Sequence, residues 1–233
     1  MQNYDLELTC QPSTGFRCIK AANSLDIDIN KKLNHKFHVE ADLETEYNIG
    51  LIVGASGSGK TTLAKHIWGE DCVKEILDKE KPVIEQLPEH YEYKDCVVAL
   101  NGSGLTSVPC WIRPSKTLSN GQQSRAELAL QLASDKKIIV IDEFTSVVDR
   151  TIAKAMAMTV QKAARKLKKK VVLLSCHYDI IEWLNPEWII DCNKQKYIDR
   201  RSFFLTINEK RNLNLKSPSA KNPAGNILAN III

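Results

Sequence analysis

Residues 54–62, with the sequence GASGSGKTT, constrain the fold of this chain more than any other segment. They fit the pattern G-x-x-x-x-G-K-[ST], in which glycines let backbone N–H groups wrap a phosphate without a Cβ in the way. The apolar run 49–53 precedes the segment, and residues 61–68, which are good helix formers, follow it. This order of strand, loop and helix predicts a phosphate-binding loop rather than an incidental glycine turn.

Each part of this loop has an expected task. Lys60 is expected to reach the β- and γ-phosphate oxygens of a nucleotide, and the Thr61 hydroxyl to bind Mg²⁺. The helix that follows offers its positive N-terminal end to the anion. The sequence thus predicts ATP and Mg²⁺ as cofactors. The residues expected to contact the nucleotide here are Gly54, Ala55, Ser56, Gly57, Ser58, Gly59, Lys60, Thr61 and Thr62.

Two carboxylates follow a second apolar run, in IIVIDE at residues 138–143. Side chains at the carboxyl end of a parallel strand emerge beside a bound nucleotide. Asp142 is expected to bind the metal, because Mg²⁺ prefers oxygen ligands. Glu143 is expected to orient or deprotonate the attacking water. Without the phosphate loop, a solvent-exposed strand end would be the better interpretation.

A second predicted anion site lies at LSNGQ, residues 118–122, which opens a helical stretch. Ser119, Gly121 and the first helical N–H groups would form it. A single phosphate loop does not need a second anion-binding helix start, so this second site calls for its own explanation.

At this point the chain resembles the ABC ATPase family, because LSNGQQ is similar to that family's signature sequence and the motif order is the same. The resemblance extends from about residue 49 to residue 177. It implies that two ATPase domains close head to tail, so that Ser119, Gly121 and Gln122 of one chain complete the site of the other.

The same resemblance assigns further roles. Glu143 matches the catalytic glutamate, and SVVD, residues 146–149, matches the D-loop, which brings Asp149 to the nucleotide. His177 matches the switch histidine that hydrogen-bonds the γ-phosphate. The expected catalytic residues are therefore Glu143, His177 and Lys60.

Three features depart from the family pattern. Asn120 stands where the family usually has a second glycine, which leaves the helix end open but alters the expected rate of hydrolysis. Gln86 is a candidate for the Q-loop glutamine, with a polar loop residue as the alternative. Phe16 and Phe37 are candidates for stacking on adenine, although packing within an N-terminal sheet explains them better.

The pattern of elements predicts an α/β fold: a P-loop NTPase of ABC ATPase type with a mostly parallel sheet. Alternation in LDIDI, residues 25–29, and at Phe37 and Val39 indicates an antiparallel N-terminal layer. Buried strands are expected at 138–141 and 171–175. Helices are expected at 125–133 and 152–167.

The polar stretch 71–115 is interrupted by prolines and glycines, and is expected to form an inserted subdomain. Short helices are expected there around 73–77 and 94–100. Residues 1–195 would then form the ATPase domain, and residues 196–233 a polar, mobile tail.

The sequence offers no apolar run near the roughly 20 residues that span a bilayer, and no secretory signal, which predicts a cytoplasmic protein. Seven scattered cysteines favour reduced thiols over metal or disulfide roles. A formal net charge of +4 does not diagnose a nucleic-acid partner. A basic cluster in and after the 152–167 helix leaves a phosphate-backbone or acidic partner open; it consists of Lys162, Arg165, Lys166, Lys168, Lys169 and Lys170.

Three functions remain open. The first is an ABC ATPase whose ATP-dependent dimerisation and hydrolysis act on an unidentified protein or nucleic-acid partner. EFTSVVDR, SCHYDIIEWLNPEW and SVPCWIRPSKTLSNGQ resemble a soluble group found in phage and mobile elements, sometimes joined to an acetyltransferase-like domain. The second is the ATP-binding subunit of a transporter, which needs a membrane partner. The third is an ATP-gated switch with little turnover.

Overall fold

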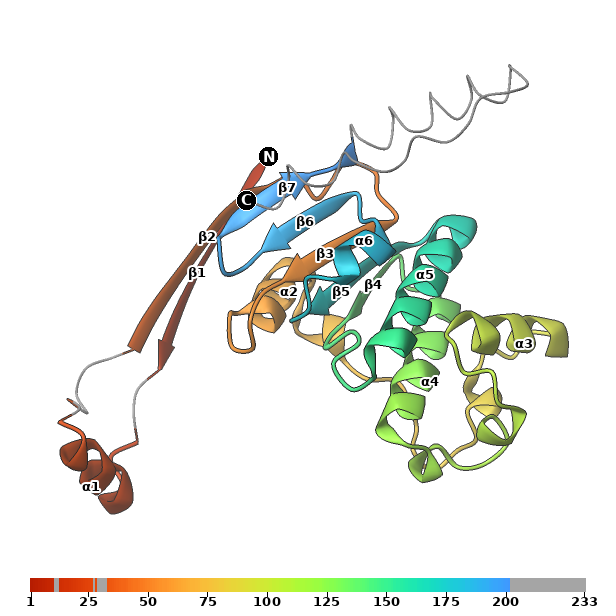
Figure 1. Cartoon of the computed structure of the whole chain (residues 1–233), viewed down its shortest axis with the longest axis horizontal. Helices are drawn as coiled ribbons and strands as arrows, with labels where there is room; N and C mark the ends of the chain where they lie inside the picture. The colour runs from red at the N-terminus through yellow and green to blue at the C-terminus, as the bar shows by residue number, and fades with distance from the viewer. Residues whose placement is uncertain (11–12, 27, 29–32, 202–233) are drawn as a thin grey trace. The chain divides into compact units, whose positions relative to one another are not determined.

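The computed structural model describes residues 1–10, 13–26, 28 and 33–201 (Figure 1). The chain divides into two compact units, Met1–Asp199 and Arg200–Ile233. The first unit contains both sheets, and nearly all of the second lies outside the described residues.

The central sheet has five strands in the order β4-β5-β3-β6-β7. The first four run parallel, and β7 pairs antiparallel with β6. The predicted mostly parallel sheet is confirmed. The strand β7 consists of the first four residues of the segment expected to form the tail. The bounds are β3 Ile49–Val53, β4 Ile138–Ile141, β5 Lys170–Ser175, β6 Trp188–Asp191 and β7 Lys196–Asp199.

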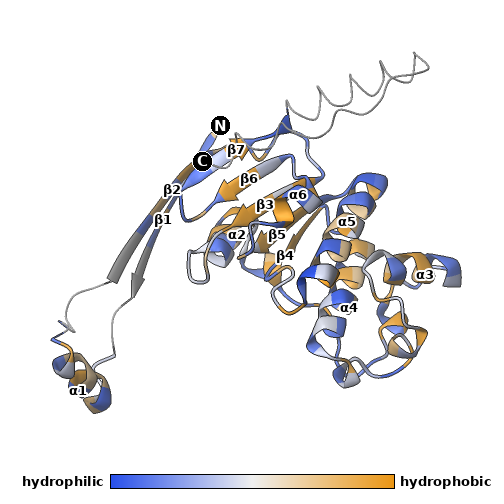
Figure 2. Cartoon of the chain, in the orientation of Figure 1, coloured by the Kyte–Doolittle hydropathy of each residue, from blue (hydrophilic) through white to orange (hydrophobic). Residues whose placement is uncertain are grey.

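Both faces of this sheet are covered, so its inner strands consist mostly of apolar residues. Every residue of β3 is buried. Successive side chains point to opposite faces of the sheet, so Leu51 lies in one hydrophobic core and Ile52 in another. Figure 2 shows the inner strands as hydrophobic, whereas the helices around them carry hydrophilic stretches.

Helices cover both faces of the sheet, and all but α6 were expected from the sequence. The core on Leu51's side includes residues of α4, α5 and α6, and the core on Ile52's side includes residues of α2 and the N-terminal hairpin. The four helices are α2 Lys60–Trp68, α4 Asn120–Ala133, α5 Arg150–Leu167 and α6 Ile180–Leu184.

The expected antiparallel N-terminal layer is a hairpin of β1 (Gln2–Cys10) and β2 (Leu33–Ala41). Phe37 is 3% exposed and packs in the core, so it serves this layer as a packing residue. The expected strand at residues 25–29 is not supported where the chain is described. Leu25 instead follows the helix α1 (Phe16–Ser24), and residues 27 and 29 lie outside the described residues.

The inserted segment forms short helices around its own core against α4. The expected helix at 94–100 is confirmed as α3, Tyr93–Gly102. The expected helix at 73–77 is wrong, because the Glu127 carboxylate accepts the backbone N–H groups of Ile76 and Leu77. Four 3₁₀ turns complete the insertion: η1 Glu70–Val73, η2 Ile84–Gln86, η3 Val108–Cys110 and η4 Ser115–Thr117.

The six residues of the basic cluster fall into two groups, one in contact with other parts of the protein and one exposed. The Arg165 guanidinium donates to the Asn185 carbonyl and the Glu187 carboxylate, and the Lys169 ammonium donates to the Leu132 carbonyl at 2.8 Å. Lys170 lies over the Tyr47 ring. These three side chains are engaged in holding the protein together, whereas Lys162, Lys166 and Lys168 are exposed.

Gly50 gives a first testable prediction. A Cβ at this position would lie 2.0 Å from Cζ2 of the fully buried Trp188. We expect Gly50→Ala to lower the free energy of unfolding by about 1–3 kcal/mol or more, because the packed core cannot move aside. Chemical unfolding with denaturant measures this change.

The matched control is Gly102→Ala in α3, where a Cβ would meet no atom within 4 Å. Alanine there should leave stability unchanged or raise it by up to about 1 kcal/mol, because alanine is the better helix former. Equal stability of Gly50→Ala and the wild type would contradict the tight packing of Gly50 against Trp188.

Candidate active site

The phosphate loop lies at the carboxyl end of β3 and leads directly into α2. All three of its glycines, Gly54, Gly57 and Gly59, have positive φ angles. A Cβ on Gly54 would also lie 2.4 Å from the Ser58 hydroxyl oxygen. Both the backbone conformation and the close contact therefore require glycine at the start of the loop.

Lys60 is folded back onto its own loop. Its ammonium nitrogen donates to the carbonyls of Gly54 and Ala55, each at 2.9 Å. This geometry places a positive charge at the mouth of the loop, where a phosphate would replace the two carbonyls as its partner.

Thr61 and Asp142 meet across the sheet edge, although they are 81 positions apart in the chain. The Thr61 hydroxyl donates to Oδ2 of Asp142 at 2.7 Å, and Oδ1 accepts the Glu143 N–H at 2.8 Å. The pair of oxygen ligands predicted for Mg²⁺ is thus preassembled. Mg²⁺ commonly takes one or two protein ligands and completes its shell with phosphates and water, so these residues fit the metal of a Mg²⁺–nucleotide complex.

No cluster of three or more His, Cys, Asp or Glu side chains in the described ranges is placed to hold a metal by itself. Burial raises the pKa of the Cys192 thiol, beside the phosphate loop, to about 12. That thiol therefore stays neutral and acts as a packing group near physiological pH.

Glu143 lies on a strained turn that points it outward. Its φ is 49°, and that of Thr145 is 67°, an unfavourable region for residues other than glycine. The turn is held by the Phe144 N–H, which donates to the Leu174 carbonyl at 2.8 Å, and by Ser146, whose N–H donates to the Glu143 carbonyl at 3.0 Å. The Glu143 side chain is exposed, while Phe144 is buried. Strain of this kind is typical of functional positions.

A cavity of about 430 Å³ opens beside these carboxylates. Its wall includes Asp142, Glu143 and, from the start of α4, Asn120 and Gln123. The inserted segment 73–79 lines the same cavity. This segment, tied to α4 through Glu127, is a part of the site that sequence reasoning did not find.

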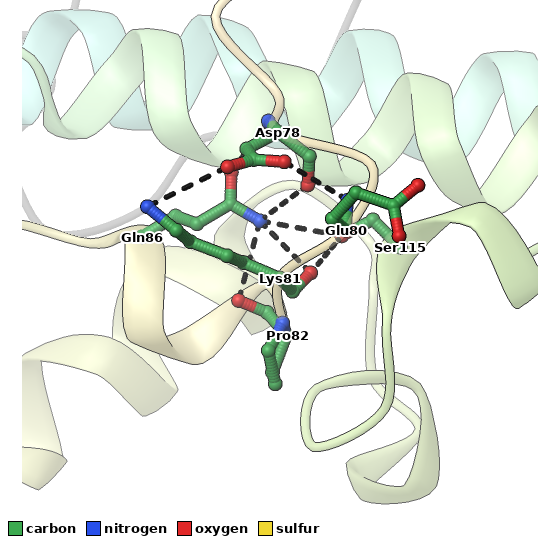
Figure 3. A network of polar contacts seen from close by, with 6 residues as sticks. All are labelled: Asp78, Glu80, Lys81, Pro82, Gln86 and Ser115. Atoms are coloured by element: carbon green, nitrogen blue, oxygen red, sulfur yellow. Dashed lines mark hydrogen bonds and ion pairs between the residues drawn. The ribbon is translucent and has the colours of Figure 1, made fainter.

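The Gln86 side chain forms hydrogen bonds within the insertion (Figure 3). Its side-chain amide donates to the carbonyls of Asp78 and Lys81, at 2.9 Å and 3.1 Å, and its oxygen accepts the Asp78 N–H. These contacts favour the alternative interpretation, in which Gln86 is a polar loop residue that shapes the insertion. Phe16, the other adenine candidate, is 79% exposed on α1.

The predicted signature residues cap α4. The Ser119 hydroxyl accepts the Gln122 N–H at 3.3 Å, and Gln122 Oε1 accepts the Ser119 N–H at 3.0 Å. This capping box fixes the helix start, and the Ser119 hydroxyl keeps its own proton for donation. A Cβ on Gly121 would lie 3.2 Å from Val148, so glycine allows the helix start to pack on the predicted D-loop.

Asp149 and His177 complete the predicted set. The Asp149 carboxylate caps α5, accepting the N–H groups of Thr151 and Ile152. His177 follows β5, which lies between β3 and β4 in the sheet. This order places the histidine loop between the phosphate loop and the Asp142–Glu143 turn. His177 is half-buried, and its backbone N–H donates to the Ser175 hydroxyl at 3.1 Å.

Comparison with known proteins places this geometry in a family, although no protein-family model matches the chain. The energy-coupling factor transporter ATP-binding protein EcfA1 of Leuconostoc mesenteroides is 33% identical over 205 residues, covering 69% of this chain and 75% of that protein. The chain belongs to the ABC ATPases.

Other relatives agree with this assignment. The methionine import ATP-binding protein MetN of Clostridium tetani is 24% identical over 190 residues, covering 64% of this chain and 57% of that protein. The chain thus spans little more than half the length of that relative.

Solved structures show the same fold. A dimeric post-hydrolysis state of an ATP-binding cassette bound to ADP and Pi gives a TM-score of 0.56 at 18% identity, covering 71% of this chain and 92% of that one. A dimeric bacterial ABC transporter cassette gives 0.52 at 17% identity, with 67% and 87% covered. No helix in the described part of this ABC ATPase combines the length and apolar character of a membrane crossing.

Proposed function

We propose that this ABC ATPase binds and hydrolyses ATP with Mg²⁺ in a site completed by the signature of a second copy. The observation that carries the proposal is the contact of Thr61 with Asp142, which joins the phosphate loop to the metal-binding strand end. Mg²⁺ would supply charge neutralisation at the phosphates. Lys60 would hold the phosphate oxygens, and Glu143 would accept a proton from the attacking water.

The signature is proposed to act in trans. Ser119 caps the start of α4 with a hydroxyl proton to donate, and the helix end adds a positive dipole. Asp149 is proposed to reach the neighbouring site through the D-loop, and His177 to hydrogen-bond the γ-phosphate. Dimeric cassettes with the same fold support this arrangement.

A mixing experiment tests the composite site. Lys60→Ala and Ser119→Ala are each expected to be inactive as homodimers. When the two are mixed in equal amounts, half of the dimers are mixed, and each of these has one site with both wild-type residues. At most about a quarter of the wild-type ATPase rate should return, because Lys60→Ala chains also bind ATP less tightly and dimerise less readily.

The control pair is Lys60→Ala mixed with Glu143→Gln. Both residues belong to the same half-site, so no mixed dimer has an intact site and no activity should return. Failure of the first pair to regain activity above its separate components would contradict a signature acting in trans.

For the work driven by hydrolysis, we propose a protein partner. A membrane subunit of a transporter is one form that such a partner could take, and the names of the relatives, which are transporter ATP-binding proteins, support it. Copurification of a membrane subunit would establish this form. A nucleic-acid partner has less support, because three of the six basic residues are engaged within the protein. Kinship with the soluble phage-associated group remains a hypothesis that rests on the quoted segments.

A further inference from the structure

The turn after β6 lies directly against the start of the phosphate loop. The Cys192 N–H donates to the Val53 carbonyl at 2.7 Å, and a Cβ on Gly54 would lie 3.0 Å from the Cys192 Cβ. One residue further, the Asn193 side-chain oxygen accepts the Ala55 N–H at 3.2 Å. A segment 138 positions away in the chain thus contacts the loop backbone.

A buried carboxylate fixes the conformation of this turn. Asp191 is 4% exposed, and its Oδ1 accepts the N–H groups of Asn193 and Lys194, at 3.0 Å and 3.1 Å. The same oxygen accepts the Tyr178 hydroxyl at 3.0 Å. A buried carboxylate without hydrogen bonds is unfavourable, so these three hydrogen bonds to Asp191 stabilise the turn.

Tyr178 connects this turn to the histidine loop. Its hydroxyl accepts the Asn193 side-chain N–H at 3.2 Å while donating to Asp191. Both hydrogen-bonding faces of the Asn193 amide are therefore defined: its nitrogen donates to Tyr178, and its oxygen accepts from Ala55. Tyr178 directly follows His177, so one chain of contacts runs from the histidine loop to the phosphate loop.

The Ala55 peptide is held from both sides. Its carbonyl accepts the Lys60 ammonium at 2.9 Å, and its N–H donates to Asn193. When Lys60 turns to a phosphate, its hydrogen bond to the Ala55 carbonyl can be lost. The bond to Asn193 does not depend on Lys60 and can persist, so it can keep the loop in place while its lysine changes partner.

We propose that Asn193, oriented by Tyr178 and Asp191, is a positioning residue that fixes the phosphate loop for ATP and couples it to the His177 loop. This inference rests on the proposed ATPase function. It adds two side chains, Asn193 and Tyr178, that lie outside the nucleotide-contacting motifs.

The test uses the full chain with Asn193→Ala and, separately, Tyr178→Phe. Each change removes a hydrogen bond that orients the loop. Equilibrium affinity for ATP should fall about threefold to tenfold, the range for one such bond. The KM for ATP should rise by a similar factor, with a smaller change in kcat. Because the two side chains act in one chain of contacts, the double variant should lose less affinity than the two factors multiplied.

The matched control is Tyr197→Phe in β7. It also removes a tyrosine hydroxyl, but this hydroxyl comes from a strand and donates to the Asp42 carbonyl at 2.9 Å. Its ATP affinity should equal that of the wild type. Unchanged affinity in both Asn193→Ala and Tyr178→Phe would overturn the inference, and so would an equal loss in Tyr197→Phe. A wild type that binds ATP without hydrolysing it would instead contradict the proposed function, while the affinity comparison still tests the positioning role.

Discussion

Replacing Glu143 by glutamine is expected to reduce steady-state ATP turnover by about 100-fold or more, the usual contribution of a general base. Glutamine has the same shape but cannot take a proton from water. The turn should survive, because its recorded hydrogen bonds use backbone atoms of Glu143 and the side chain of Asp142. Release of phosphate at saturating Mg²⁺–ATP measures the loss.

The control for this prediction is Glu89→Gln, which removes an exposed carboxylate from a loop of the insertion. Its turnover should match that of the wild type. Undiminished turnover in Glu143→Gln would mean that another group activates the water, and the assignment of Glu143 would be wrong.

Lys60→Ala is expected to have the other large effect, on nucleotide binding itself. The ammonium is the one loop side chain that carries a positive charge, and hydrogen bonds to a charged group contribute about 1.5–3 kcal/mol each. Affinity for ATP should fall at least about tenfold, and turnover should fall to background. A fluorescent ATP analogue displaced by ATP measures the affinity.

Lys65→Ala, five residues further along α2, is the matched control. Its ammonium pairs at 3.1 Å with the exposed carboxylate of Glu70, and such surface pairs contribute little. ATP affinity should therefore be unchanged. If Lys60→Ala bound ATP as well as Lys65→Ala does, the loop would not be the phosphate site.

The sequence was sufficient to predict the parts of this fold that depend on local pattern. Buried strands such as 49–53 and 138–141 are apolar because both faces of the sheet are covered, and that property is visible in the residues themselves. The contact of Thr61 with Asp142 agrees with the prediction that both residues serve one Mg²⁺, since parallel strands place their carboxyl ends at one edge.

Features set by distant contacts were not predictable in the same way. The segment 73–77 has helix-forming residues, but the backbone N–H groups of Ile76 and Leu77 donate to the Glu127 carboxylate, and the segment is irregular. Gln86 matched a motif expectation by residue type, whereas its actual partners are carbonyls within the insertion. Asn193 carries no motif signal, because its role depends on Ala55, which is far away in sequence.

The helix α1 was missed for a different reason. It has no buried residues, so no core-facing pattern required it to be helical, and the alternation that follows it suggested a strand instead. Its exposed Phe16 was considered for the nucleotide only because of its residue type.

The most direct measurement of the central claim is the molar mass of Glu143→Gln in solution, by light scattering at tens of micromolar protein. A site shared by two chains should close around ATP and stay closed when hydrolysis is blocked. We expect a monomer without nucleotide and a dimer with Mg²⁺–ATP, while the Lys60→Ala/Glu143→Gln double variant stays monomeric in both. A Glu143→Gln protein that binds ATP and remains a monomer would contradict the composite site.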